Sequence, residues 1–392
     1  MEFGIERFCS WYRCDMRAGS IETRTLRPGP VLGGVLVLLA GTCGAAEPCA
    51  SRVTETLPVA ENPRGGVAAD IDDDGRTDLV VVAHGADSVS VLGNRGKRGF
   101  KRSDYPIGRT PYHVAVGDFD GDGFNDLVAV NFGAADEQVY WGARKGFARG
   151  PLLPTGNKPR SVAAGDFDED GLVDIASADS QSDSVGIHFG AKNRVFSELK
   201  SLPAGGNPHG IAAIDLDGDG HLDLVVANGV REGSVAVLMG DGKGGFAPYR
   251  TYRAGDTPYG LAVGDVDGDG VPDVATGDYR SNTLSLLLGK GDGTLAPAQA
   301  FAVGDGPVMA TIADVTGAGT RQIVVANFKS DDVDVVRYRR QSGFKRILRI
   351  AQMDGPYEAL AARLGPGQAN SLAILKSKTG EVAVVDVTCP GN

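Results

Sequence analysis

Basic residues and long apolar runs are both scarce in this sequence. The 392 residues include 39 lysines and arginines against 50 aspartates and glutamates, which gives a formal net charge of −11. Phosphate binding needs a basic face, so this balance argues against nucleic acid as a partner. The apolar run at 31–40 is shorter than the roughly 20 residues of a membrane-spanning helix, and we expect no transmembrane span.

Familiar catalytic motifs are missing as well. The sequence contains no G-x-S-x-G, H-E-x-x-H or C-x-x-C, and its five histidines show no spacing typical of metal ligands. Aromatic residues make up only 7%, whereas glycine is abundant at 57 residues. This composition is typical of many short strands joined by tight turns.

The first 46 residues are predicted to form a secretory leader. A basic segment precedes the apolar run at 31–40, and small residues follow at 44–46, in the order of a signal peptide. The basic segment is unusually long, so Met16 is an alternative start. A lipid anchor at Cys43 is the less favoured alternative to free release. We therefore expect an exported protein that is secreted, periplasmic or held at the cell surface.

Cysteine usage fits that expectation. Of the five cysteines, only Cys49 and Cys389 remain after cleavage behind residue 46, one at each end of the mature chain. Two cysteines in an oxidising compartment favour a disulfide over two unpaired thiols.

One phrase, D-x-D-x-D-G-x-x-D, dominates the rest of the sequence. Intact copies begin at Asp70, Asp118, Asp166, Asp215 and Asp265, and degenerate copies begin at Asp314 and Arg363. Successive copies start 48 to 50 residues apart. Seven units at one period predict a single repeat domain over 47–392, without a linker or a second domain.

Each unit carries the signals of four short strands. A turn ending in proline opens the unit, and a strand of small residues follows, as at 162–165 and 261–264. The aspartate phrase, an apolar strand and an alternating strand come next. The last strand often starts at Gly-Phe, as at Phe100, Phe147, Phe246 and Phe344. Four strands per unit are typical of a propeller blade, so the sequence predicts an all-β, seven-bladed β-propeller.

Two other architectures fit less well. An EF-hand shares D-x-D-x-D-G but needs a glutamate at its twelfth position and flanking helices. Here the twelfth residue is Val81 or Ala129, within an apolar strand pattern. An open solenoid would need capped ends, whereas these two ends are predicted to meet.

The last unit supplies only three strands, near 358–363, 371–376 and 381–387. The segment 52–60, upstream of the first opening turn, fits the missing fourth position. The N-terminal strand is therefore predicted to complete the last blade. Cys49 and Cys389 would then lie side by side, and their bond would stabilise the closed ring by roughly 2–5 kcal/mol.

The repeated phrases "GDFDGDGFNDLVAVN" and "GDVDGDGVPDVATGD" resemble the FG-GAP/VCBS repeats of integrin-α-like propellers. The resemblance covers about residues 51–389. It implies that each aspartate loop joins the first and second strands of a blade. It also implies that the loop binds Ca²⁺ through side chains at positions 1, 3, 5 and 9 and through the backbone carbonyl at position 7. Hard oxygen donors in this number suit Ca²⁺ better than Mg²⁺, and four adjacent carboxylates need a cation.

About five structural Ca²⁺ ions are therefore expected, one in each intact loop. The side-chain ligands would be Asp70, Asp72, Asp74, Asp78, Asp118, Asp120, Asp122, Asp126, Asp166, Asp168, Asp170, Asp174, Asp215, Asp217, Asp219, Asp223, Asp265, Asp267, Asp269 and Asp273. The carbonyl ligands would be those of Arg76, Phe124, Leu172, His221 and Val271. The degenerate loops at Asp314 and Arg363 are expected to be metal-free.

The candidate binding face lies at the opposite end of the blades. The residues that follow the opening prolines are Arg64, Tyr112, Arg160, His209, Tyr259, Val308 and Tyr357. Blade repetition would place them around the mouth of the central channel. The residues after the second strands add Asn131, Asp179, Asn228, Asp278 and Asn327. Exposed polar turn residues are the simpler interpretation of both sets.

We expect a monomeric binding or scaffold module that recognises a glycan, a peptide or an extracellular protein through this mouth. Arginines there would bind anionic groups, and tyrosines would stack on rings. The alternative is a polysaccharide lyase or hydrolase, for which Tyr112 and His113 are the one pair that could supply acid–base chemistry.

Overall fold

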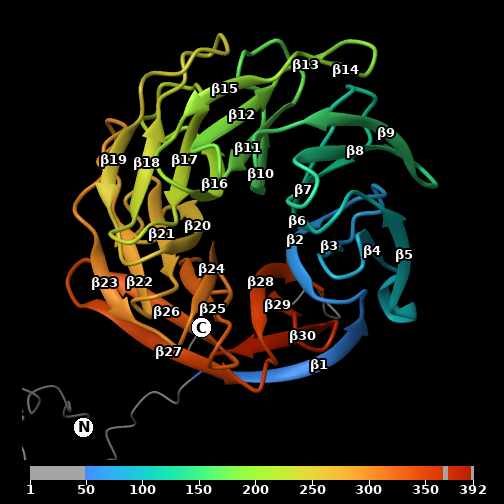
Figure 1. Cartoon of the computed structure of the whole chain (residues 1–392). Helices are drawn as coiled ribbons and strands as arrows, with labels where there is room; N and C mark the ends of the chain where they lie inside the picture. The colour runs from blue at the N-terminus through green and yellow to red at the C-terminus, as the bar shows by residue number, and fades with distance from the viewer. Residues whose placement is uncertain (1–48, 365–369, 390–392) are drawn as a thin grey trace, which may run out of the picture. The chain divides into compact units, whose positions relative to one another are not determined.

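Seven antiparallel four-stranded sheets form the blades of a β-propeller (Figure 1). The computed structural model describes residues 49–364 and 370–389. The expected leader, the alternative start at Met16 and the possible anchor at Cys43 lie outside these residues. Within the described part, no helix is long and apolar enough to cross a membrane.

The strands follow the expected order in every blade. Blade one contains β2 (Pro63–Ala69), β3 (Asp78–Ala83), β4 (Ser88–Asn94) and β5 (Phe100–Pro106), with a short 3-10 helix η1 (Gly96–Arg98) before β5. Blade two contains β6 (Pro111–Gly117), β7 (Asp126–Asn131), β8 (Asp136–Ala143) and β9 (Gly146–Pro154). Blade three contains β10 (Pro159–Gly165), β11 (Asp174–Asp179), β12 (Ser184–His188) and β15 (Lys200–Pro203), with a separate small hairpin of β13 (Gly190–Ala191) and β14 (Val195–Phe196).

The remaining blades repeat the pattern. Blade four contains β16 (Pro208–Ile214), β17 (Asp223–Asn228), β18 (Ser234–Leu238) and β19 (Arg250–Arg253). Blade five contains β20 (Pro258–Gly264), β21 (Asp273–Asp278), β22 (Thr283–Leu287) and β23 (Gln299–Ala302). Blade six contains β24 (Pro307–Ala313), β25 (Gln322–Asn327), β26 (Asp332–Arg339) and β27 (Gly343–Ala351). Blade seven contains β28 (Pro356–Arg363), β29 (Asn370–Lys376), β30 (Glu381–Thr388) and β1 (Ala50–Pro58).

Small residues in the innermost strands follow from crowding around the axis. The first strand of each blade contacts the first strands of both neighbouring blades. A Cβ on Gly65 would lie 2.6 Å from the His113 ring, and one on Gly260 would lie 2.2 Å from the Met309 sulfur. Glycine is therefore needed where two inner strands approach this closely.

The fourth strand begins later than expected in blade four. Phe246 forms only an isolated bridge with Gly240, and β19 starts at Arg250. The Asp241 carboxylate accepts the N–H groups of Lys243 and Gly245, which closes a tight turn directly after the third strand. The Gly-Phe signal thus marks a small hairpin in this blade, whereas at Phe100 it marks the start of β5.

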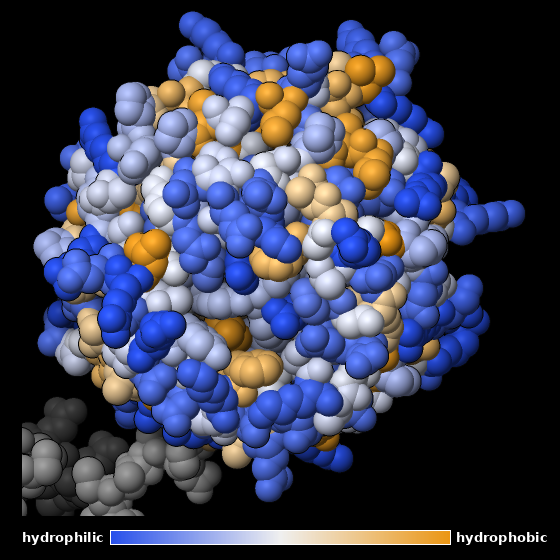
Figure 2. Space-filling view, in the orientation of Figure 1, coloured by the Kyte–Doolittle hydropathy of each residue, from blue (hydrophilic) through white to orange (hydrophobic). Residues whose placement is uncertain are grey.

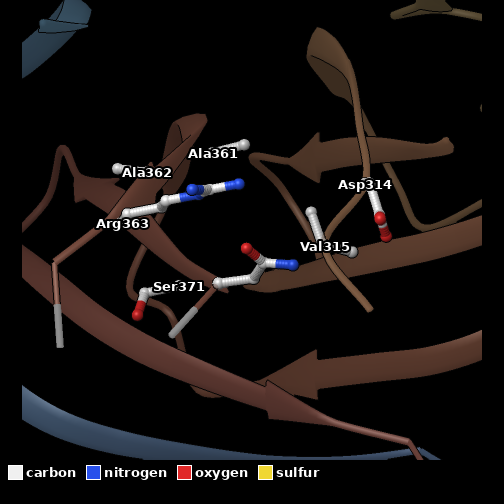
Figure 3. A pocket seen from close by; sticks show the side chains of 7 residues that line it. Asp314, Val315, Ala361, Ala362, Arg363 and Ser371 are labelled. Carbon is white, nitrogen blue, oxygen red and sulfur yellow. The ribbon is translucent and has the colours of Figure 1, made fainter. Parts of the chain in front are cut away.

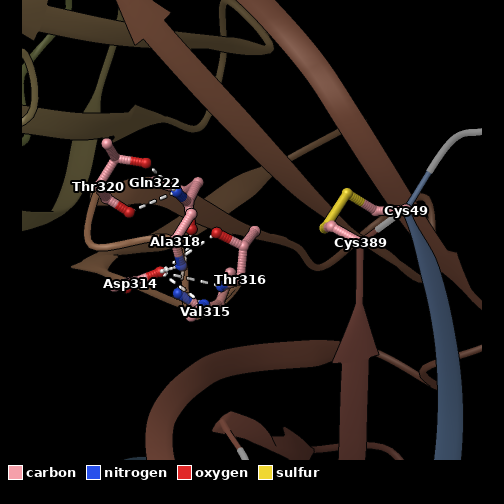
Figure 4. The surroundings of a disulfide bond; sticks show 9 residues. Cys49, Asp314, Val315, Thr316, Ala318, Thr320, Gln322 and Cys389 are labelled. Atoms are coloured by element: carbon pink, nitrogen blue, oxygen red, sulfur yellow. Dashed lines mark hydrogen bonds between the residues drawn. A yellow bond between two sulfur atoms is a disulfide. The ribbon is translucent and has the colours of Figure 1, made fainter. Parts of the chain in front are cut away.

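The N-terminal strand closes the ring, as the sequence predicts. β1 pairs antiparallel with β30, and Ala50 lies opposite Thr388. The pairing places Cys49 beside Cys389, with 4.2 Å between their Cα atoms, and the two form a disulfide (Figure 4). Such a bond is typical of an oxidising compartment.

A buried carboxyl group lies at the same junction. Glu358 on β28 of blade seven accepts the N–H of Gly66 on β2 of blade one, at 2.8 Å. Burial raises the pKa of Glu358 to about 8, although the Gly66 hydrogen bond opposes this shift. The protonated side chain therefore belongs to the contact between the first and last blades.

Replacing both Cys49 and Cys389 with serine should lower the free energy of unfolding by about 2–5 kcal/mol, because the bond closes a very long loop. Urea denaturation with and without reductant measures the loss. The native protein should lose the same amount in reductant, and the double variant should not respond. Equal midpoints for the oxidised native protein and the double variant would contradict this role.

Glu358→Gln should flatten the pH dependence of stability. Between the ordinary pKa of 4.5 and the raised value of about 8, the folded state holds a proton that the unfolded state releases. Native stability should therefore fall as pH rises through this window, by up to about 1.4 kcal/mol per pH unit. Glutamine keeps an oxygen for Gly66 and cannot ionise, so the variant should be the more stable protein at pH 8.

Urea denaturation from pH 5 to pH 9 makes the comparison, with Glu55→Gln on the exposed strand β1 as the control. The control should follow the native pH profile. An unchanged profile in Glu358→Gln would show that this carboxyl group does not cause the pH dependence.

Candidate functional site

The two ends of the ring carry different turns and loops. We call the end that carries the turns before Pro63, Pro111, Pro159, Pro208, Pro258, Pro307 and Pro356 the Pro-turn face. The opposite end, with the loops between the first and second strands, is the loop face. Because the strands within a blade are antiparallel, the turn after each second strand returns to the Pro-turn face.

The aspartate loop of blade two shows how each intact loop is built. Asp118 accepts the N–H groups of Asp122 and Gly123, so its carboxylate curls the loop around itself. Asp126, at position nine, is fully buried. Its two oxygens accept the N–H of Phe119 at 2.8 Å and the N–H of Gly142 at 2.6 Å. Position nine therefore fastens the loop to the end of the third strand.

All five intact loops bring carboxylate oxygens within 4.8 Å of one another. The groups are Asp70, Asp72 and Asp78; Asp118, Asp120 and Asp122; Asp166, Asp168 and Asp174; Asp215, Asp217 and Asp223; and Asp265, Asp267 and Asp269. Each group contains positions 1 and 3, together with position 5 or position 9. Three of the four predicted side-chain ligands thus lie together in each loop, and metal binding by them remains a prediction.

Electrostatics within the loops favours a cation. Burial, together with repulsion from neighbouring carboxylates, raises the pKa of Asp72 and Asp168. Burial raises the pKa of the position-nine carboxyls to about 7 at Asp174 and to about 6 at the other four, against their backbone hydrogen bonds. A hard divalent ion would relieve this repulsion, and all the side-chain donors are the oxygens that Ca²⁺ prefers.

Arginine side chains occupy positions where a cation would be stabilised. Arg194, from the blade-three hairpin, reaches Asp120 at 2.5 Å and Asp122 at 3.3 Å, with its guanidinium 5.2 Å from the Trp141 ring centroid. Arg340 pairs in the same way with Asp267 and Asp269 of the blade-five loop. These guanidinium groups stand in for a cation, which supports the fit of the donor set.

The degenerate loop of blade six keeps its shape without the acidic side chains. Asp314 accepts four successive N–H groups, those of residues 316–319. Gln322 occupies position nine, and its amide oxygen accepts the N–H of Val315 at 3.0 Å (Figure 4). The amide therefore replaces the structural hydrogen bond of the aspartate but not its charge.

A pocket of about 250 Å³ lies beside this loop. It is lined by Asp314 and Val315 of blade six and by Ala361, Arg363 and Ser371 of blade seven, among others (Figure 3). Arg363 occupies position one of the last repeat, where the other loops have an aspartate.

In six of the seven blades the residue after the opening proline lines a cavity at the axis, and in blade six Met309 does so. In all seven inner strands the register with the second strand shifts within three residues after the proline, as a β-bulge would cause. Repetition of this bulge brings side chains from all the blades to one place.

Five of these side chains form a hydrogen-bonded group that we call the axial cluster: Arg64, Tyr112, Arg160, Tyr259 and Tyr357. The Nη1 of Arg64 donates to the hydroxyl of Tyr112 at 2.6 Å. The Nη1 of Arg160 donates to the hydroxyls of Tyr112 at 2.8 Å and Tyr259 at 2.9 Å. Tyr357 donates to Tyr112 at 2.9 Å, and Tyr112 also bonds Tyr259.

The sequence correctly places these residues together, but the expectation of an open mouth is wrong. Tyr112, His209, Val308 and Tyr357 are all buried. The cavity among the cluster residues measures only about 10 Å³. Side chains fill the middle of the face seen in Figure 2, where Figure 1 shows a gap between ribbons. The arginines and tyrosines already bind one another, so their action on a ligand remains a prediction.

Two further expectations change in the same way. Within the described residues the hydroxyl of Tyr112 bonds Arg64, Arg160, Tyr259 and Tyr357 and not His113. Burial lowers the pKa of His113 to about 4. The residues that end the second strands are buried and bonded within their own blades, as Asn131 is to Asp136 at 2.7 Å and Asp278 is to Ser285 at 2.7 Å. They shape turns and do not ring a channel.

A second set of side chains was missed by the sequence interpretation. We call it the aromatic–lysine patch; it consists of Phe132, Tyr279 and Phe328 with Lys158, Lys329 and Lys378. The lysine Nζ atoms lie 4.4, 4.1 and 5.4 Å from the centroids of the respective rings. Each ring also packs on a tyrosine of the axial cluster. Phe132, Tyr279 and Phe328 each directly follow a second strand. This repeated aromatic position was the sequence signal that could have predicted the patch.

A groove of about 480 Å³ adjoins this patch on the Pro-turn face. Its lining includes Glu61 and Arg64 of the ring closure together with Phe328 and Lys378. The groove is the larger opening near the axis, compared with the cavity inside the axial cluster.

Among solved structures, the chain is similar to BBS1N in complex with ARL6DN, with a TM-score of 0.62 and 14% identity over 86% of this chain and 96% of that one. It is also similar to a catalytically inactive virginiamycin B lyase from Staphylococcus aureus with quinupristin, with a TM-score of 0.59 and 11% identity over 86% and 99% of the two chains. A functionally unknown protein from Desulfotomaculum acetoxidans gives 0.56 and 11% over 76% and 89%. At these identities the likeness shows the fold alone.

A search of curated proteins found no match. The profile of the FG-GAP-like repeat matches residues 70–129, 118–177, 166–226 and 215–276. These matches together cover more than half of the chain and coincide with the intact aspartate loops. With seven blades built on that repeat, the chain belongs to the FG-GAP-like repeat family.

Proposed function

We propose that this protein is an exported, calcium-stabilised binding module that docks a protein or peptide partner on its Pro-turn face. The observation that carries the proposal is the aromatic–lysine patch around a closed axis. Its three rings are half-buried, while Lys329 and Lys378 are exposed beside them. Aromatic side chains held in place from below offer contact area at little entropic cost.

The shape of this face favours a macromolecule over a small molecule. A small-molecule site usually encloses its ligand in a pocket of about 300–1,000 Å³, and the axial cavity is far smaller than that. The neighbouring groove, with Arg64 and Lys378 in its lining, suits an acidic side chain projecting from a partner. A partner surface with carboxylates and apolar side chains would therefore complement the patch.

The likeness to BBS1N, which was crystallised with ARL6DN, supports a propeller of this shape as a platform for another protein. The disulfide between Cys49 and Cys389, together with the leader-like first 46 residues, supports export. A glycan ligand and polysaccharide cleavage are the alternatives that the binding experiment below separates from this proposal.

Calcium is the second part of the proposal. The four aspartates of each intact loop, with the carbonyl at position seven, would hold one ion. The ion would cancel carboxylate repulsion and so stabilise the folded state. In this arrangement the ion has a structural role, because the loops lie on the face opposite the aromatic–lysine patch.

Calcium titration of the metal-free protein, followed by elemental analysis, should give about five ions per chain, and a chelator should lower the melting temperature because the ions bind only the folded state. Asp120→Ala should remove one ion. Thr316→Ala, at the same position of the degenerate blade-six loop, is the matched control and should leave the stoichiometry unchanged. Zero stoichiometry, or an unchanged melting temperature in chelator, would contradict calcium binding.

Peptides selected from a displayed random library on the immobilised protein should be enriched in acidic and apolar residues. Phe328→Ala should weaken their binding by roughly 1–3 kcal/mol, as a central interface residue does. Tyr249→Ala is the control, because Tyr249 is 39% exposed near the outer strand of blade four. Calorimetric titration of each variant with one selected peptide gives the comparison.

The same protein, with and without calcium, should be screened against uronate polymers and other glycans. Saturable glycan binding that Phe328→Ala abolishes would replace the protein partner with a carbohydrate. Release of unsaturated uronate products, seen as ultraviolet absorbance, would establish the lyase alternative. Loss of peptide binding in Tyr249→Ala with normal binding in Phe328→Ala would place the site on the outside of the ring.

A further inference from the structure

The axial cluster contains two positive charges and no negative partner. Among the described residues, neither Arg64 nor Arg160 forms an ion pair with a carboxylate. Their guanidinium groups bind only tyrosine hydroxyls in the cluster. Both arginines are half-buried, and a charge that is partly removed from water without a counterion is unfavourable.

Hydrogen-bond donors in the same place also lack acceptors. The Nε atoms of Arg64 and Arg160 are shielded from solvent and have no hydrogen-bond partner in the described part of the chain. Both ring nitrogens of His209 are likewise shielded from solvent and have no hydrogen-bond partner among the described residues. Burial, with the Arg160 charge adding to it, lowers the pKa of His209 to about 3, so the ring is neutral and still carries one N–H.

These groups line one cavity at the axis. Arg64, Arg160 and His209 border it together with the three tyrosines of the axial cluster. Its volume of about 10 Å³ is close to the smallest that holds one water molecule, so a halide ion, which is somewhat larger than water, requires the lining side chains to move slightly apart. A carboxylate, phosphate, sulfate or sugar is too large for this space.

We propose that the axial cavity binds one small monovalent anion, chloride under physiological conditions, between Arg64, Arg160 and His209. The anion compensates one of the two half-buried positive charges and accepts the unpartnered N–H groups. Water would satisfy those donors but would leave both charges uncompensated. The site is separate from the ions at the loop face, and it shares Arg64 with the groove on the Pro-turn face, so the test below uses the protein without a partner.

The other way to compensate the charge is to ionise a tyrosine. The Arg160 charge and the hydrogen bonds from Tyr112 and Tyr357 lower the pKa of Tyr259, even though burial acts to raise it. Burial instead raises the pKa of Tyr357 well above its usual value, and neighbouring tyrosines add to the rise. Tyrosinate at Tyr259 is therefore the competing outcome that the experiment must separate from anion binding.

The test is thermal unfolding of the full mature chain at pH 7.5 and saturating calcium, in sodium chloride, sodium bromide or sodium gluconate of equal ionic strength. Gluconate is too large for the cavity. Chloride and bromide should raise the melting temperature by about 2 °C for each tenfold increase above the dissociation constant, and gluconate should not. The ³⁵Cl resonance should broaden on adding native protein and sharpen again with bromide.

Arg160→Gln should remove both the halide dependence of melting and the ³⁵Cl broadening, whereas Arg52→Gln on exposed β1 should keep both. The measurements on native protein remain decisive if Arg160→Gln does not fold. Equal melting temperatures in chloride and gluconate, without ³⁵Cl broadening, would overturn the proposal. A tyrosinate absorbance band near 295 nm in the native protein at pH 7.5, lost on unfolding, would assign the compensating charge to Tyr259 instead.

Discussion

A buried carboxylate at the start of the second strand fixes the loop and the third strand within each of blades one to five. In blade two, Asp126 joins the N–H of Phe119 in the loop to the N–H of Gly142 near the end of the third strand. The same pair of bonds recurs in blade five through Asp273 to Val266 and Gly289. First strand, loop and third strand are thus fixed by one side chain. Without it the aspartate loops would have no fixed place on the ring.

This constraint explains both what the sequence reveals and where it misleads. Strand order, seven blades, closure by the N-terminal strand and the Cys49–Cys389 bond were all predictable, because each rests on a local signal repeated at one period. The aspartate spacing was attributed to metal alone. Asp126 and Gln322 show that position nine has a structural task of its own, which an amide performs in blade six. The repeated aspartate spacing therefore has two explanations, the proposed calcium binding and the hydrogen bonds of position nine, and it is not specific for calcium alone.

The axis could not be predicted in the same way. An arginine or tyrosine after a proline has the signature of an exposed turn residue, and Arg160 and Tyr259 lie in different blades far apart in sequence. Their partial burial and their contact with each other depend on the bulge that follows every opening proline and on the radius of a seven-bladed ring. Both are properties of the assembled fold. The aromatic–lysine patch was not predicted for a related reason. Its three rings can be recognised as a group only once the positions of the tyrosines that they pack against are known.

Breaking the repeat at the axis has a physical reason. Seven copies of one long side chain would meet at a point, and seven arginines would repel one another while seven tyrosines would not fit. The chain instead places two arginines, three tyrosines, a histidine and a valine at these seven positions. Arg64 of blade one donates to Tyr112 of blade two and lies near Tyr357 of blade seven, its neighbours on either side. Arg160 of blade three similarly joins Tyr112 to Tyr259. These hydrogen bonds fill most of the axis, but they leave a small cavity and two guanidinium charges without a counterion, and a small anion on the axis is the simplest way to balance them.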